Sequence, residues 1–427
     1  MSSIDVPVAL LGYGTVGAAV SRLLADGADD IERATGHRLR VVRALVRDLE
    51  KQRAFPADPD VLTTDIATIR DDPSIAVVAE VMGGVEPTGD YVLELLRAGK
   101  PVVSANKQLV ARRGSELFAA AHAAGVQLRF EASVCAAIPV IKVLRESLVV
   151  SNVHRVLGIV NGTTNFMLTR MEAGATYAEA LAEAQRLGYA EADPTDDVSG
   201  ADAAAKMAIL ATVAFGSRFT IGDVSYEGIE RIAPDHVRAA SDLDAVVRLV
   251  GSATLADGHV DVRVSPAFVD RSHPLAAVDG AINAVMLQGD AIREITLEGP
   301  GAGGVETASA VVADMVSVIG TTGTGFLQND PCWRELSRME PGEWRSAWYL
   351  GIEVVDRPGV LAQIALRLAN HGVSVARLEQ RVLNGHAALD MTTHEAPQGA
   401  LEAALDEIEA LDETQERPVV YPVVGAK

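Results

Sequence analysis

Cysteine and basic residues are scarce in this sequence, and this disfavours several specialised classes of protein. It holds two cysteines in 427 residues, Cys135 and Cys332, with no Cys-x-x-Cys pair, so it supports neither a disulfide framework nor a zinc site. Basic residues number 37 against 58 acidic ones, and the net charge of −21 disfavours binding to nucleic acid or to an anionic membrane surface. A reducing, cytoplasmic location fits these features best.

The sequence gives no sign of an export signal or a membrane span. Residues 1–5 lack the basic region that opens a signal peptide, and the charge-free run 6–21 is interrupted by Gly12, Gly14 and Gly17. Apolar residues make up 48% of the chain and charged residues 22%, which is typical of a globular protein. At roughly 150 residues per domain, the length suggests about three domains.

Strand and helix signals alternate through the first third of the chain. Apolar runs at 6–11, 39–46, 75–82, 101–107 and 126–131 are separated by helical patterns, among them 90–98 and 108–124. This alternation predicts a parallel sheet covered by helices on both faces, and hence an α/β domain over residues 1–135.

Two further domains are expected after this one. Mixed signals, including the capping box Thr176 to Glu179 that opens a helix running to Gly188, predict an α+β domain over 136–320. Residues 323–346 have the turn residues of a linker. The tail, 347–427, has the order strand, helix, strand, strand, helix, strand, which is the βαββαβ order of a small ferredoxin-like domain.

Three glycines in the first domain predict a dinucleotide site. Gly12, Gly14 and Gly17 follow a strand and open a helix, so they allow a tight turn, close approach to a pyrophosphate and close helix packing. We therefore expect a Rossmann-type domain. At the end of the second strand, Arg47 favours the 2′-phosphate of NADP, while Asp48 leaves NAD open. The alternative is that both are solvated charges.

The densest group of reactive side chains lies between residues 188 and 206. Five carboxylates precede Lys206, which lies on an alanine-rich apolar helix. Asp202 and Lys206 are four residues apart and share a helix face, and a buried pair of this kind needs partners or a function. A structural ion pair is the alternative. Carboxylates suit a substrate ammonium group, and a lysine among them can exchange a proton.

Weaker signals lie at other strand ends. Lys107 follows Ser104 at the carboxyl end of a parallel strand, where open α/β sheets bind ligands. Backbone N–H groups and hydroxyls of 161–165 could hold a carboxylate, and Glu131 with the carbonyls that follow it could hold a hard cation. Each also has an ordinary structural explanation, as a surface lysine, a turn and a strand-end carboxylate.

Taken together, these stretches resemble homoserine dehydrogenase. The resemblance rests on GYGTVG (12–17), SANKQLVA (104–111), FEASVCAAIPVIK (130–142), NGTTNFML (161–168), GYAEADPTDDVSGADAAAKMAILA (188–211) and GPGAGGVETASAVVADM (299–315), in this order. Members of that family interconvert L-homoserine and L-aspartate 4-semialdehyde with NAD(P) in threonine, methionine and isoleucine biosynthesis. The tail, with DRPGVLAQIA at 356–365, resembles an ACT domain, a regulatory module that binds amino acids.

The resemblance implies a role for individual residues. Lys206 would transfer the proton, with Lys107 a second lysine beside the nicotinamide. Residues 136–320 would form the catalytic and dimerisation domain, and the segment at about 300–322 would return to complete the first domain. The substrate would be held by Gly162, Thr163, Glu191, Asp197 and Asp202, and the cofactor by Gly12, Gly14, Thr15, Val16, Gly17, Arg47, Ser104, Lys107, Gly188 and Gly303. A monovalent cation, usually sodium, would be held by Glu131 and the carbonyls of Val134, Ala136 and Ile138.

An amino-acid effector is expected in the tail, and L-threonine is the natural candidate as an end product of the pathway. Asp356, Gly359 and Asn370 lie in the turns that would contact it, since backbone N–H groups at a helix start can face a carboxylate. We also expect a homodimer or homotetramer.

The sequence departs from the family at two places. Ala136 and Ala137 stand where at least one glycine is usual, which puts the cation site in question, and Glu306 stands where proline is expected. Two competing interpretations are a dehydrogenase for another amino-acid substrate and a non-catalytic amino-acid sensor. The paired motifs NGTTN and GYAEADP argue against the first, and the retained lysines and carboxylates argue against the second.

Overall fold

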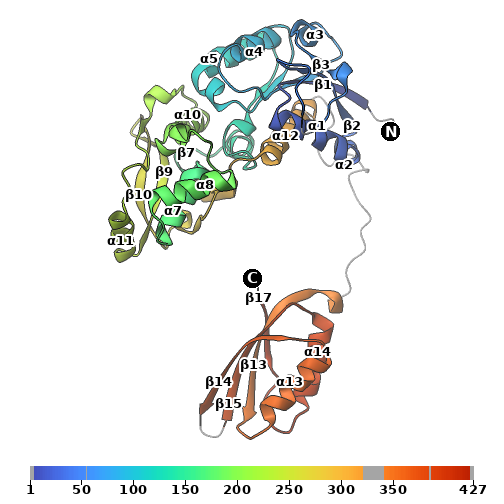
Figure 1. Cartoon of the computed structure of the whole chain (residues 1–427), viewed down its shortest axis with the longest axis vertical. Coiled ribbons are helices and arrows are strands. Elements are labelled where there is room, and N and C mark those ends of the chain that lie inside the picture. Colours follow the sequence, from blue (N-terminus) through green and yellow to red (C-terminus); the bar gives the residue numbers. More distant parts are fainter. Residues whose placement is uncertain (1–3, 54, 321–340, 384–385, 424–427) are drawn as a thin grey trace. The chain divides into compact units, whose positions relative to one another are not determined.

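A computed structural model of the chain describes residues 4–53, 55–320, 341–383 and 386–423. The chain forms two compact units, Met1–Cys332 and Trp333–Lys427, each of which is described by itself (Figure 1). Cys332, residues 323–340 of the predicted linker and the predicted turn at 384–385 lie outside the described ranges. Within those ranges, no helix has the length and apolar content that crossing a membrane requires.

The first unit begins with a six-stranded sheet whose neighbouring strands are all parallel, in the order β3-β2-β1-β4-β5-β6. Its strands are β1 (Ile4–Leu11), β2 (His37–Leu45), β3 (Leu62–Thr63), β4 (Val77–Glu80), β5 (Val102–Ser104) and β6 (Leu128–Arg129). Its helices are α1 (Thr15–Asp26), α2 (Ala28–Thr35), α3 (Ala67–Arg70), α4 (Thr88–Arg97) and α5 (Lys107–Ala124), with α12 (Gly304–Gly320) contributed from later in the chain. This strand order is that of a doubly wound dinucleotide-binding fold, and it confirms the predicted Rossmann-type architecture.

Both faces of this sheet are buried because residues along β1 alternate between two apolar cores. Val8 and Leu10 belong to the core that includes side chains of α1 and α12, whereas Ala9 and Leu11 belong to the core that includes side chains of α4 and α5. The helix α12 packs along α1, so the chain returns to the first sheet after building the second.

The second sheet of this unit has the order β12-β11-β7-β9-β10-β8, antiparallel except for the β10–β8 pair. Its strands are β7 (Val153–Ile159), β8 (Ser225–Tyr226), β9 (Ala245–Ala256), β10 (His259–Asp270), β11 (Ile282–Gly289) and β12 (Arg293–Pro300). Its helices are α6 (Val140–Lys142), α7 (Gly162–Glu172), α8 (Tyr177–Leu187), α9 (Thr195–Val198), α10 (Ala201–Phe215) and α11 (Pro234–Asp242).

Two local predictions for this domain are confirmed. The Thr176 hydroxyl accepts the Glu179 backbone N–H at 3.3 Å, and the Glu179 carboxylate accepts the Thr176 N–H at 2.8 Å, which completes the capping box. The helix α8 then ends at Gly188, whose φ of +80° suits glycine. The apolar helix α10 is buried from Asp202 to Ala211, and it packs against β7, β9, β10 and α5.

The second unit has the predicted βαββαβ order. Its elements are β13 (Arg345–Val355), α13 (Val360–Asn370), β14 (Val375–Leu383), β15 (His386–Thr393), β16 (Ala396–Pro397), α14 (Gln398–Glu409) and β17 (Val419–Val423). The antiparallel sheet has the order β14-β15-β13, with β16 and β17 also pairing with β13. Ile364 and Leu368 of α13 and Leu401 of α14 pack with Leu350 and Ile352 of the sheet in one core. Since β13 begins at Arg345, the last two residues of the predicted linker belong to this strand.

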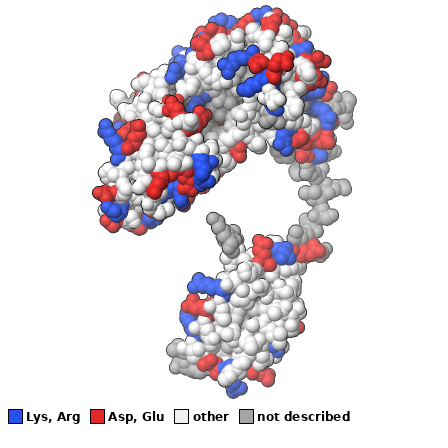
Figure 2. All heavy atoms as spheres, in the orientation of Figure 1, with Lys and Arg blue, Asp and Glu red and all other residues white. Residues whose placement is uncertain are grey.

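Acidic and basic side chains are interspersed on the face of both units drawn in Figure 2. The described residues on this face form no continuous basic stripe of the kind that binds nucleic acid.

Candidate active site

The turn between β1 and α1 has the geometry of an anion-binding site. A Cβ atom at Gly12, where φ is +103°, would lie 2.9 Å from the Val81 carbonyl oxygen, and one at Gly17 would lie 2.3 Å from the Gly12 carbonyl oxygen. By contrast, a Cβ at Gly14 would meet no heavy atom within 4 Å, so this glycine leaves open space. Thr15 begins α1, whose first turn carries no acidic residue. The helix N-terminus therefore presents its N–H groups to an anion such as a pyrophosphate.

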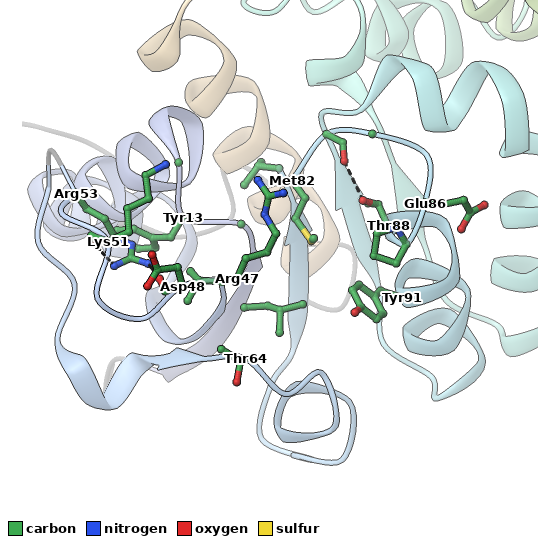
Figure 3. A pocket seen from close by; sticks show the side chains of 18 residues that line it. Tyr13, Arg47, Asp48, Lys51, Arg53, Thr64, Met82, Glu86, Thr88 and Tyr91 are labelled. Atoms are coloured by element: carbon green, nitrogen blue, oxygen red, sulfur yellow. Dashed lines mark hydrogen bonds between the residues drawn. The ribbon is translucent and has the colours of Figure 1, made fainter.

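A cleft of about 790 Å³ lies beside this turn, at the carboxyl edge of the first sheet (Figure 3). Asp48, Lys51 and Arg53 gather on one side of it and Thr88 on the other, with Arg47 between them. The cleft is further lined by Gly12, Tyr13, Gly14, Leu45, Val46, Thr64, Val81, Met82, Gly83, Gly84, Glu86, Pro87 and Tyr91. Arg47 lies two residues beyond the end of β2, so it is on a loop and not on the strand. The residues present suit a dinucleotide with extra negative charge at its adenosine end.

The remaining residues predicted to hold the cofactor occupy other positions. Val16 follows Thr15 in the first turn of α1. Ser104 is fully buried, and its hydroxyl donates to the Glu80 carboxylate at 2.6 Å. Gly188 is the C-cap of α8, and Gly303 immediately precedes α12.

A second site forms where α5 and α10 meet the end of β7. Lys107, the first residue of α5, and Lys206, in the middle of α10, both contact the Asp202 carboxylate. The Lys206 Nζ atom lies 2.9 Å from Asp202 Oδ2, as expected for residues four apart, and it donates to the Val160 carbonyl oxygen at 2.7 Å. The Lys107 contact joins residues 95 positions apart in the sequence. It therefore brings the first domain to the substrate-binding residues predicted in the second.

Asn161 connects two carboxylates of this cluster. Its side-chain amide donates to Asp197 Oδ1 at 2.7 Å and to Asp202 Oδ2 at 2.9 Å. The same residue caps α7, because its Oδ1 atom accepts the Thr164 N–H at 2.8 Å. The NGTTN turn was recognisable in the sequence, but this role of Asn161 was not predicted from it. The signal available was a helix-capping residue directly after an apolar strand.

Burial and charge act in opposite directions on the lysine–carboxylate pair. Burial by itself would raise the pKa of Asp202, but the adjacent Lys206 and Lys107 ammonium groups outweigh it and hold that pKa below its usual range. Burial would lower the pKa of Lys206, but the attraction of Asp202 outweighs it, so the Lys206 pKa is raised. Asp197 differs, because burial raises its pKa and the Asn161 hydrogen bond only partly compensates. The contact with Asp202 therefore favours the protonated form of Lys206.

The N-terminus of α7 adds groups that suit a carboxylate. Gly162 begins this helix, and a Cβ there would lie 2.6 Å from the Ala281 carbonyl oxygen, so the close approach requires glycine. Thr163 follows, and its hydroxyl donates to the Tyr189 carbonyl oxygen at 2.6 Å, which ties α7 to the segment after α8. The first N–H groups of a helix have no partner within the helix and attract anions.

The five carboxylates between 191 and 202 do not act as one cluster. Asp197 and Asp202 share Asn161 within the site. Asp193 instead accepts the Thr195 N–H and hydroxyl at 3.1 and 2.6 Å, which stabilises the start of α9. Glu191 and Asp196 are exposed.

The loop predicted to hold a cation is tightly folded around Glu131. This buried carboxylate accepts the N–H groups of Ile141 and Lys142 at 2.7 and 2.8 Å, and burial raises its pKa to about 7. The loop also holds Cys135 and Ala136 at φ values of +54° and +38°, a conformation that favours glycine. The Ile138 carbonyl oxygen already accepts the Val140 N–H at 2.8 Å.

A monovalent cation would fit the chemistry of this loop. No group of three or more His, Cys, Asp or Glu side chains suited to a metal occurs in the described part of the chain. The predicted site is of another kind, with one carboxylate and three carbonyl oxygens, the carbonyls being those of Val134, Ala136 and Ile138. A buried carboxylate with a raised pKa is one that a nearby cation would stabilise.

The structure separates the residues predicted to bind an effector in the second unit. Asp356 and Gly359 lie in the exposed turn before α13, and Gly359 is its N-cap with a φ of +93°. Asn370 is the last residue of this 11-residue helix, so it lies about 16 Å away at the rise of an α-helix. Within one chain, Asp356 and Gly359 are therefore separated from Asn370 by the length of α13, and the grouping of all three around one effector stays a prediction.

Glu80 is a residue that the sequence analysis missed. It ends β4, is fully buried, and accepts hydrogen bonds from the Met82 and Gly83 N–H groups at 2.9 and 3.3 Å. The signal was a single carboxylate within the apolar run 75–82.

Sequence comparisons link both domains of the first unit to one family. Residues 139–316 match the family described as "Homoserine dehydrogenase", and residues 12–131 match "Homoserine dehydrogenase, NAD binding domain". Residues 348–413 match "ACT domain". The homoserine dehydrogenase of Bacillus subtilis is 39% identical over 429 residues, which cover 98% of each chain. That of Corynebacterium glutamicum is 41% identical over 98% of this chain and 94% of its own.

Solved structures give the same relationship. A homoserine dehydrogenase from Thiobacillus denitrificans matches with a TM-score of 0.71 at 38% identity, over 99% of each chain. A hyperthermophilic archaeal homoserine dehydrogenase in complex with NADPH matches with a TM-score of 0.64 at 27% identity, over 76% of this chain and all of its own.

Proposed function

The chain belongs to the homoserine dehydrogenase family, and we propose that it oxidises L-homoserine and reduces L-aspartate 4-semialdehyde with Lys206 as the proton-transferring residue. As a homoserine dehydrogenase it is an oxidoreductase acting on a CH–OH group, with an NAD(P)-binding first domain. The observation that supports the role of Lys206 is its buried contact with Asp202, the carboxylate that also contacts Lys107. Lys107 begins α5 and Lys206 lies on α10, so Asp202 joins the first sheet's helices to the residues proposed to hold the substrate.

Proton transfer follows from the hydrogen bonds of Lys206. An ammonium group has three N–H bonds, and Asp202 and the Val160 carbonyl take two of them. The third remains for the oxygen of the substrate. In the direction of reduction it donates its proton to the aldehyde oxygen, and in the direction of oxidation the neutral amine accepts the hydroxyl proton. The bound nicotinamide cofactor supplies or accepts the hydride.

The two charged ends of the substrate match opposite features of the site. The amino-acid carboxylate would bind at the N-terminus of α7, where Gly162 and Thr163 contribute N–H groups. The ammonium group would pair with Asp197 and with the exposed Glu191. The pKa of Asp197 is raised because the Asn161 hydrogen bond only partly offsets the effect of burial, so a cation beside it would be favourable.

NADP is the proposed cofactor. The support is Arg47 in the lining of the cleft, with Lys51 and Arg53 beside it, since guanidinium groups form charge-assisted bonds to a phosphate. Asp48 in the same lining suits the ribose hydroxyls of NAD, so NAD would also bind, but less tightly. The archaeal relative crystallised with NADPH is consistent with this preference.

Two further ligands complete the proposal. A monovalent cation, sodium by analogy with the family, would be held by Glu131 and the carbonyls of Val134, Ala136 and Ile138. L-threonine would bind the second unit at the turn of Asp356 and Gly359, where the N-terminus of α13 meets open space at Gly359. Inhibition would then link this catalytic step to the end product of the pathway, and assembly would be as a homodimer or homotetramer.

Steady-state kinetics of the full-length protein tests the function. The absorbance of the reduced nicotinamide is followed with L-homoserine and either NADP or NAD. L-Serine, which is one carbon shorter, serves as the control substrate. We expect homoserine-dependent reduction of both cofactors, with NADP preferred. Equal rates with homoserine and serine, or no rate with either cofactor, would overturn the proposal.

A further inference from the structure

Glu80 is a buried carboxylate at the carboxyl end of a central strand that the proposed chemistry does not use. It is the last residue of β4 and has no exposed surface. Burial raises its pKa, and hydrogen bonds from Ser104, Met82 and Gly83 oppose that rise. A buried carboxylate is costly unless its hydrogen bonds serve the surrounding structure. The groups that donate hydrogen bonds to Glu80 show which parts of the structure it holds in place.

One oxygen of Glu80 holds the loop that lines the cofactor cleft. Glu80 Oε1 accepts the N–H groups of Met82 and Gly83 at 2.9 and 3.3 Å. The Gly83 carbonyl accepts the Thr88 hydroxyl at 2.9 Å, as the dashed line in Figure 3 shows. Gly83 and Gly84 adopt φ values of +73° and +69°, and residues 81–84 all line the cleft. This loop, which we term the cleft floor, is therefore fixed from its buried side.

The other oxygen of Glu80 holds the start of the helix that carries Lys107. Glu80 Oε2 accepts the Ser104 hydroxyl at 2.6 Å, and the same Ser104 oxygen accepts the Asn106 N–H at 3.1 Å. Asn106 caps α5, since its Oδ1 atom accepts the Leu109 N–H at 3.1 Å. Lys107 is the next residue and begins α5.

The two sets of hydrogen bonds that start at the Glu80 oxygens, which we term its two arms, meet again at Asn106. Its side-chain amide donates to the Gly84 carbonyl oxygen of the cleft floor at 2.6 Å. Glu80, Ser104, Asn106 and the floor therefore form a closed set of hydrogen bonds. Moving the floor relative to α5 would break at least one of them.

We propose that Glu80 is a positioning residue that fixes the cleft floor, and with it the cofactor bound in the cleft, relative to Lys107. The inference rests on the proposed function, because this spacing matters for hydride transfer and not for folding. An enzyme gains much of its rate by holding the reacting groups in place, and a displacement of about 1 Å can cost roughly 100-fold.

Glu80→Gln tests the inference with little change in volume. A carboxylate accepts through both oxygens, whereas an amide accepts through one and donates through the other. The amide N–H of the variant must therefore face either the Met82 and Gly83 N–H groups or the Ser104 hydroxyl. One of the two sets of hydrogen bonds made by Glu80 is then lost or rearranged. We expect kcat for homoserine oxidation to fall about 10- to 100-fold, and the Kd of NADPH, from nicotinamide fluorescence, to rise about 10-fold.

Two variants each remove one of the two sets of hydrogen bonds that start at Glu80. They should change kcat and the Kd of NADPH to different extents, which a merely structural role would not produce. Thr88→Val keeps the shape of the side chain but removes the floor's bond at Gly83, so it should raise the Kd of NADPH and leave kcat within about threefold. Ser104→Ala removes the hydrogen bonds that lead to Asn106 and Lys107, so it should lower kcat about 10-fold, a larger factor than the rise it causes in the Kd of NADPH. These variants also decide the question if Glu80→Gln does not fold.

Glu172→Gln is the matched control for loss of a half-buried carboxylate. Glu172 accepts from Arg248 at 2.6 Å and from the Val247 N–H at 3.1 Å, away from the cleft. It should lower the melting temperature and leave kcat and the Kd of NADPH unchanged. The inference is overturned if Glu80→Gln leaves both parameters within twofold, or if the two single-arm variants lose kcat and affinity in the same proportion. A parent protein inactive on homoserine would overturn the proposed function instead.

Discussion

Replacing Asp202 with asparagine should shift the pH dependence of homoserine oxidation toward lower pH. The substitution keeps the shape of the side chain and removes the charge that both lysines contact. In the parent, Lys206 must lose a proton before it can accept one from the hydroxyl group, and its pKa is raised. Oxidation should therefore accelerate with pH through the neutral range. Without Asp202, burial is the main remaining influence, and burial lowers the pKa of a lysine.

The size of the shift can be bounded from the geometry. The Lys206 Nζ atom is 2.9 Å from Asp202 Oδ2, and two unit charges at that distance attract by about 6 kcal/mol at an effective dielectric constant near 20. Since one pH unit corresponds to about 1.4 kcal/mol, the pH profile can move by at most about 4 units, and we expect at least about 1. Breaking a buried ion pair also costs about 3–5 kcal/mol of stability, which the hydrogen-bonding amide partly offsets.

The assay is kcat/KM for L-homoserine measured across pH at saturating NADP, at a temperature where the variant remains folded. Lys206→Ala should abolish the ascending limb and lower kcat by about 10²–10⁴-fold. Glu172→Gln, which removes a carboxylate from the buried Arg248, should reduce stability without moving the limb. If Asp202→Asn keeps the parent pH profile, or if Lys206→Ala retains the ascending limb, Lys206 is not the proton-transferring group.

Three further outcomes can be measured. Arg47→Ala should raise KM for NADP about 10-fold or more and KM for NAD about twofold at most, since charge-assisted bonds contribute about 1.5–3 kcal/mol; equal changes would show that Arg47 does not bind the 2′-phosphate. The pKa of Glu131 is raised from 4.5 to about 7, so the folded chain holds its proton more tightly than the unfolded one, and stability in sodium-free buffer should fall by up to about 3 kcal/mol as pH rises through this range. Thermal denaturation should show Glu131→Gln reducing that slope, and sodium stabilising the parent more at about pH 8 than at about pH 5; a sodium effect that persists in the variant would place the cation elsewhere. L-Threonine should inhibit the full-length enzyme, and Asp356→Ala should raise the concentration needed for half-inhibition; activity that does not respond to threonine would leave the second unit without this role.

Features that depend on neighbouring residues could be predicted from the sequence. The glycine turn followed from its spacing, and the structure gives Gly12 and Gly17 close backbone contacts and Gly14 open space. The capping box at Thr176 and the ion pair of Asp202 and Lys206 followed from helical geometry, which places residues three or four apart on one face. The pattern of apolar residues likewise predicted the order of strands and helices along the chain in the first and last domains.

What the sequence could not supply was the distance between residues far apart in the chain. The contact of Lys107 with Asp202 spans 95 positions, and it exists only because α5 packs against α10. In the sequence, Glu80 is one charged residue in an apolar run, and its contact with Ser104 exists only because β4 and β5 lie side by side. Asp356 and Asn370 looked like neighbouring turns, yet α13 holds them at opposite ends. Periodicity reports which face of an element is buried, whereas the packing of those faces decides which side chains meet.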